Sequence, residues 1–70
     1  MDMRPKLIDA GFGRMEIAIG KLRREVIKYP GCAGTSIRTL QSIVAGKSPG
    51  KPAVILALAE IIGCEPNELI

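Results

Sequence analysis

The chain has 70 residues, a net charge of +3, two cysteines and no histidine. One small domain is expected at this length, and so few cysteines without histidine exclude a disulfide framework and the usual zinc spacings. We therefore expect no metal and no cofactor. The longest uninterrupted apolar run, residues 53–59, is too short to cross a membrane, so we expect a cytoplasmic protein.

An aliphatic core is predicted, because 47% of the residues are hydrophobic and only Phe12 and Tyr29 are aromatic. Such cores suit helices packed on helices, so we expect an all-α fold in one domain, a compact bundle of four to five short helices. Residues 1–13 are a candidate for a loosely ordered arm. Within them residues 5–10 could form a short turn of helix that ends at Gly11.

Residues 14–28 are predicted to form an amphipathic helix that ends before Pro30. Ile17 and Ile27 fall off its apolar stripe, which predicts that another element or a partner covers them. The stripe itself consists of Met15, Ala18, Ile19, Leu22, Val26 and Tyr29.

Residues 36–45 are predicted to form a second helix with clear start and stop signals. Thr35 or Ser36 can cap its N-terminus, and Gly46 can supply a left-handed residue at its end. Its predicted apolar side is formed by Ile37, Leu40, Ile43 and Val44, and its outward side by Arg38, Gln41, Ser42 and Ala45.

Residues 52–62 are predicted to form a third helix, begun by Pro52 and stopped by Gly63. Its composition is so apolar that other elements must cover it nearly all round. A last turn begun by Pro66 follows.

The outward side of the 36–45 helix has the chemistry of a probe for the DNA major groove. That groove admits one α-helix, and Arg and Gln side chains can hydrogen-bond base edges bidentately. We therefore expect Arg38, Gln41 and Ser42 to read bases in double-stranded DNA. Beyond the helix C-terminus, Lys47, Ser48 and Lys51 are candidates for contacts to the sugar–phosphate backbone.

The charge distribution favours the same partner. Residues 20–51 hold seven basic residues against one acidic residue, whereas residues 52–70 hold three acidic residues and no basic one. A basic middle of this kind is typical of proteins that bind polyanions. It adds Arg23, Arg24 and Lys28 to the candidate phosphate contacts, and Thr35 is a further, uncharged candidate.

The sequence gives little support for an enzymatic function. The segment VAGKSPGK, residues 44–51, ends like a phosphate-binding loop, but Gln41 stands where that motif needs its first glycine. The chain has no histidine, and its acidic residues are scattered rather than paired, so we expect no catalytic site.

The segments GTSIRTLQSIVAGK and AVILALAEIIGCEPNELI resemble the phage repressor and Cro-type (XRE-like) helix-turn-helix family over residues 34–70. The resemblance implies a sequence-specific transcriptional regulator, and it adds Ser36 and Ile37 to the base-facing positions. The matching residues are Gly34, Leu40, Ile43, Gly46, Lys47, Leu58, Ala59, Glu60, Gly63, Glu68 and Leu69.

One position departs from that family. Pro30 stands where the family has a small helical residue, and proline within a helix costs roughly 3 kcal/mol. The helix before the turn is therefore either shortened to a single turn near residues 31–34, or replaced by residues 14–28 through a longer turn.

Two further expectations concern partners. A chain this small gains affinity and half-site register by pairing, so we expect a homodimer on DNA, with no membrane partner and no small-molecule substrate. The alternative function is a small protein-interaction module, antitoxin- or antirepressor-like, in which the apolar 53–62 helix with Ile17 and Ile27 forms the interface.

Overall fold

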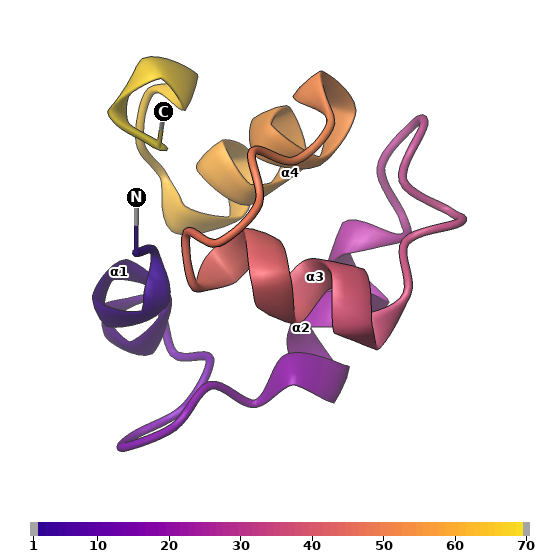
Figure 1. The fold of residues 1–70 in the computed structure, drawn as a ribbon. Coiled ribbons are helices and arrows are strands. Elements are labelled where there is room, and N and C mark those ends of the chain that lie inside the picture. The colour runs from indigo at the N-terminus through magenta and orange to yellow at the C-terminus, as the bar shows by residue number, and fades with distance from the viewer. Residues whose placement is uncertain (1, 70) are drawn as a thin grey trace.

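Four α-helices and one 3-10 helix form the fold of residues 2–69, the part of the chain that this computed structural model describes (Figure 1). In chain order they are α1 Arg4–Asp9, α2 Ile19–Val26, α3 Ile37–Val44, α4 Pro52–Ile62 and the 3-10 helix η1 Pro66–Leu69. The predicted all-α bundle is confirmed for residues 2–69, where the β-type pairing is an isolated bridge between Gly13 and Ile17.

The core is aliphatic, as predicted. Every α-helix contributes one leucine that has no exposed surface, and α2 packs on both α3 and α4, while η1 packs on α4. These four leucines are Leu7, Leu22, Leu40 and Leu58. One small core therefore fixes α3 against the other helices and leaves its opposite side to solvent.

The N-terminal segment belongs to this core, which corrects the expectation of a loose arm. Leu7 is fully buried, while Met3 and Phe12 retain only 2% and 9% exposure. The backbone N–H of Met3 donates to the carbonyl of Val44 at 2.8 Å. Figure 1 shows α1 beside the C-terminal end of α3, the helix predicted to bind DNA.

The helix predicted over residues 14–28 is shorter, because α2 begins only at Ile19. Residues 13–17 form a tight turn, in which Gly13 has a φ of 142° and a Cβ would collide with the carbonyl oxygen of Glu16. Its apolar residue Met15, predicted for the core, is 94% exposed. The helical periodicity of the sequence therefore continues through a segment that is not helical.

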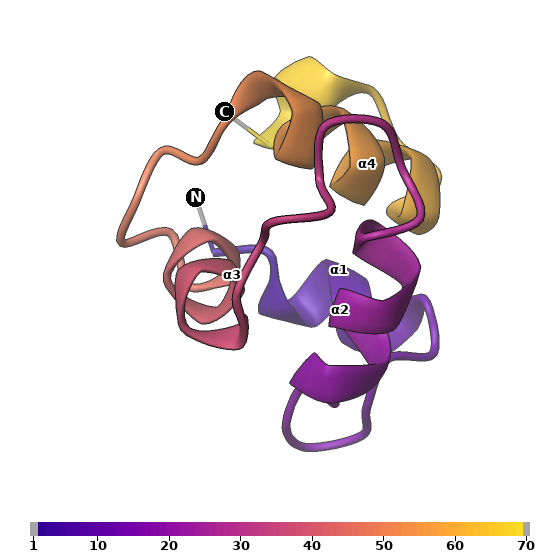
Figure 2. The same ribbon diagram turned by 90° about the vertical axis from the view of Figure 1, so that its right-hand side faces the viewer.

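The connection between α2 and α3 is long. Of the two alternatives for Pro30, the structure therefore has the one in which a longer turn joins the helix predicted over residues 14–28 to α3. Residues 27–36 join the helices, and in them Tyr29 accepts a backbone hydrogen bond from Cys32 at 3.2 Å. Pro30 and Gly31, whose φ is 80°, stand at the centre of this turn in the order that a type II turn prefers. Figure 2 shows the connection rising towards α4 before it descends to α3.

Of the two helices after this connection, α4 has the predicted limits, and α3 is one residue shorter at each end than predicted, with Ser36 and Ala45 as its caps. Pro52 opens α4, and Gly63 ends it with a φ of 87°. Six consecutive positions of α4, residues 54–59, illustrate its burial: only Leu56 is exposed, at 56%, and the other five are buried, namely Val54, Ile55, Ala57, Leu58 and Ala59.

Candidate nucleic-acid interface

The outward side of α3 carries the residues that were predicted to read bases. Arg38 and Gln41 are exposed and Ser42 is half-buried, while the other side of the helix buries Leu40 and Ile43. The structure thus presents an eight-residue helix with one polar side that is open to solvent at Arg38 and Gln41.

Ser36 and Ile37 lie at the start of this helix. The hydroxyl of Ser36 accepts from the backbone N–H of Thr39 at 3.1 Å and lies 2.9 Å from the Thr39 hydroxyl, so Ser36 is the N-cap. Ile37 is 44% exposed. Its assignment to the apolar side of the helix is therefore wrong, and its exposure agrees with the base-facing position that the family resemblance implies.

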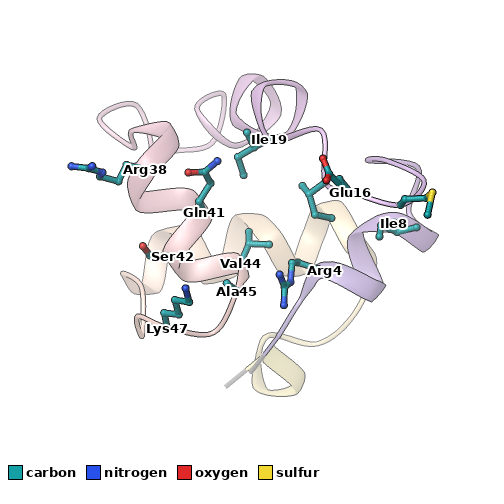
Figure 3. A pocket seen from close by; sticks show the side chains of 12 residues that line it. Arg4, Ile8, Glu16, Ile19, Arg38, Gln41, Ser42, Val44, Ala45 and Lys47 are labelled. Carbon is teal, nitrogen blue, oxygen red and sulfur yellow. The ribbon is translucent and has the colours of Figure 1, made fainter.

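A groove of about 480 Å³ runs along α3 (Figure 3). Val44 and Ala45 line it, and four residues predicted to contact DNA border it from α3 and the loop after it: Arg38, Gln41, Ser42 and Lys47. In Figure 3 Gln41 points into the groove, whereas Arg38 extends away from it at the N-terminal end of α3.

The opposite wall of the groove was not predicted. It is built by α1, the 13–17 turn and the first residue of α2, and it consists of Arg4, Ile8, Met15, Glu16, Ile17 and Ile19. No local sequence signal connects these positions with residues 38–47. They meet because the fully buried Leu7 of α1 and Leu22 of α2 share the core with Leu40 of α3.

Arg4 on this wall is paired with Asp2. The guanidinium donates to both carboxylate oxygens, through Nε at 2.9 Å and Nη2 at 2.8 Å. These hydrogen bonds lower the pKa of Asp2 to about 2. Both side chains are largely exposed, so the pair is accessible to solvent and to a bound anion.

The loop after α3 presents the predicted phosphate contacts at its surface. Lys47 and Lys51 are exposed and Ser48 is half-buried. The backbone N–H of Lys47 donates to the carbonyl of Ser42 at 2.9 Å, which fixes the start of the loop against the last turn of α3.

Two of the residues predicted to contact phosphate support α3 instead. Thr35 is buried, and its carbonyl accepts from Nε of the half-buried Arg23 at 2.9 Å. This bond joins α2 to the residue just before the N-cap of α3. Because Thr35 is covered and Arg23 is engaged, we assign both to holding α3 in place.

The remaining basic residues of α2 are exposed. Lys28, which lies just beyond the C-terminal end of α2, pairs with Glu25 in the last turn of that helix at 3.3 Å. Nε of Arg24 lies 3.4 Å from the carbonyl of Gly20. Arg24 and Lys28 do not line the groove, so the structure separates them from the residues that border it.

Residues 2–69 hold no cluster of three or more potential metal ligands, and none of their helices is long and apolar enough to span a membrane. Cys32, which is buried, and Cys64, which is half-buried, are free thiols. No protein-family model, curated protein or solved structure matches the chain.

Proposed function

We propose that this protein is a sequence-specific double-stranded DNA-binding transcriptional regulator of the phage or bacterial repressor/Cro type. The observation that carries the proposal is α3: a capped helix, buried on one side, that presents Arg38, Gln41 and Ser42 on the other and ends at an exposed basic loop. Its chemistry is non-covalent recognition of bases and phosphates.

The spacing on α3 supports base reading. Residues three or four positions apart on a helix have Cβ atoms about 5–6 Å apart, and neighbouring bases on a strand are about 3.4 Å apart. Arg38 and Gln41 can therefore address neighbouring or next-neighbouring base pairs. An arginine suits the O6 and N7 acceptors of guanine, and a glutamine suits N6 and N7 of adenine.

The support of α3 differs from that of a short helix-turn-helix, in which three or four residues join the two helices. Here α2 packs on α3 across the 27–36 connection. Two features stiffen that connection: the fully buried Cys32 and the hydrogen bond from Arg23 to Thr35. We propose that these contacts hold the recognition helix rigid in place of a short turn.

The test is selection of binding sites from a pool of random duplex DNA at near-physiological salt, followed by sequencing. Wild type should enrich a motif, and Arg38→Ala should lower discrimination at one base position by about 1–3 kcal/mol. Gln41→Ala should relax a neighbouring position. Lys6→Ala, which removes the same charge outside the groove, is the matched control for Arg38→Ala and should leave the motif intact.

Two results would contradict this proposal. Equal losses of affinity for target and random DNA in Arg38→Ala would remove the base-reading role of α3. Absence of any enriched motif with the wild-type protein would remove sequence-specific binding altogether, and would favour the alternative of a protein-interaction module.

A further inference from the structure

The groove beside α3 has a second wall whose chemistry the proposed function does not yet use. That wall carries one cation, Arg4, one carboxylate, Glu16, and one highly exposed apolar side chain, Met15. Together with Arg38 and Lys47 on the α3 side, three cations and one carboxylate border the groove, and Asp2, which pairs with Arg4 at 2.8 Å, reduces their net charge to +1. The groove therefore has the charge that suits a polyanion.

Met15 is held at the rim of this groove by a constrained turn. The Gly13–Ile17 bridge closes the turn, and the backbone N–H of Ala18 donates to the carbonyl of Phe12 at 2.7 Å. Gly13 adopts a φ that side-chain-bearing residues rarely reach. The turn thus positions an apolar side chain in solvent, where it has few contacts of its own within the chain.

Arg4 faces the end of α3 from across the groove. In Figure 3 it lies on the α1 side, opposite Ala45 and Lys47. The floor between the two cations includes Val44 and Ala45, which are apolar. Cations at the borders and an apolar floor match a chain of alternating phosphates and sugar rings.

We propose that one sugar–phosphate strand of duplex DNA lies in this groove while α3 occupies the major groove. The inference rests on the proposed function and extends it to two residues of the opposite wall. Arg4 contacts a phosphate together with Lys47, and Met15 packs on the deoxyribose of the same strand. Glu16 opposes this binding.

The geometry of a duplex supports the placement. A helix in the major groove is bordered by a backbone strand on either side, because the groove is only about 12 Å wide. Phosphate contacts are what fix the register of a protein on DNA. With the strand held between α3 and the 13–17 turn, Arg38, which extends away from the groove, approaches the bases at one fixed register.

The test measures affinity for the selected duplex as a function of salt concentration. Arg4→Ala should weaken binding and reduce the salt slope by about 0.9, the value for one lost phosphate contact. Met15→Ala should weaken binding roughly fivefold at every salt concentration and leave the slope unchanged, since it removes apolar contact only.

Two matched controls lie outside the groove. Lys6→Ala removes a charge from the same helix as Arg4, and Leu56→Ala shortens an exposed apolar side chain on α4. Lys6→Ala should change the affinity for DNA less than Arg4→Ala does, and Leu56→Ala should change it less than Met15→Ala does. Glu16→Gln keeps the size of the side chain, removes the opposing charge and should strengthen binding.

The outcomes distinguish a failure of the proposed groove contact from a failure of the proposed DNA-binding function. If Arg4→Ala and Met15→Ala behave like their controls while Lys47→Ala weakens binding, the strand does not lie in the groove, and the proposed function stands. If the wild-type protein binds no duplex selectively, both are overturned. Circular dichroism of each variant checks that a loss of binding is not a loss of folding.

Discussion

At the scale of single residues, Arg23 shows how a basic side chain in a basic segment can serve the fold. Its Nε donates to the carbonyl of Thr35 across the α2–α3 connection, whereas Arg24 reaches only its own helix. A charged hydrogen bond in a half-buried setting contributes about 1 kcal/mol after solvent screening. Arg23→Met should therefore lower the free energy of unfolding by that amount in urea denaturation.

Arg24→Met is the control for this experiment, because it removes the same charge from the neighbouring exposed position. It should change the free energy of unfolding by less than about 0.5 kcal/mol. Equal destabilisation by the two variants would show that the bond to Thr35 does not hold the connection.

Substitution can separate the N-cap role of Ser36 from its proposed contact with DNA. As N-cap it satisfies the Thr39 amide, so Ser36→Ala should cost about 1 kcal/mol of stability. Ser36→Asp keeps a capping oxygen and adds a negative charge that the helix N-terminus favours, so thermal unfolding should stay near wild type. The same charge repels phosphate, so Asp at this position should weaken DNA binding. Unchanged affinity would place the start of α3 away from DNA.

At the scale of elements, two glycines of similar surroundings should respond oppositely to alanine. A Cβ would meet nothing within 4 Å at either Gly20 or Gly63, so the backbone alone decides. Gly20 lies inside α2 without a positive φ, and Gly20→Ala should stabilise by about 0.5–1 kcal/mol. Gly63 ends α4 with a φ of 87°, and Gly63→Ala should destabilise by about 1–2 kcal/mol.

Thermal unfolding of the two glycine variants under identical conditions gives the comparison. Shifts of the melting temperature in the same direction would contradict the assignment of the Gly63 residue to a left-handed cap. Double substitution should give the sum of the two effects, because the sites belong to different helices and an added methyl group would contact no other residue at either one.

The elements that the sequence predicts well are those whose ends are marked locally. Ser36 and Pro52 open α3 and α4, and Gly63 closes α4, each through its own backbone or side-chain chemistry. The start of α2 has no such marker, since Ala18 offers no capping side chain. The apolar periodicity predicts that the helix includes Met15. In the structure Met15 lies in the turn that begins at Gly13, and α2 starts only after this turn.

At the scale of the whole molecule, half of the candidate site could be predicted and half could not. Arg38, Gln41 and Lys47 follow from one helix and the loop after it, which the sequence places together. Arg4 and Met15 reach the same groove only through packing of α1 and the 13–17 turn on a shared core. Contacts of this kind depend on the tertiary arrangement, which periodicity and capping signals do not contain.

The size of the molecule limits how it can act on an operator. Its principal extents are 28 × 24 × 21 Å, whereas half-sites one helical turn apart are about 34 Å from centre to centre. If the proposed function holds, one chain with one base-reading helix covers one half-site, and reading an inverted repeat requires the homodimer expected from the sequence. Sedimentation on a selected inverted repeat should give two chains per duplex.

Half-site spacing tests this dimer directly. Inserting about five base pairs turns one half-site to the other side of the duplex, since a helical turn is about 10.5 base pairs. Cooperative binding should then disappear while the affinity for an isolated half-site stays the same, as titrations of the two duplexes would measure. Equal affinity and cooperativity at both spacings, or one chain per inverted repeat, would show that the protein reads DNA as a monomer.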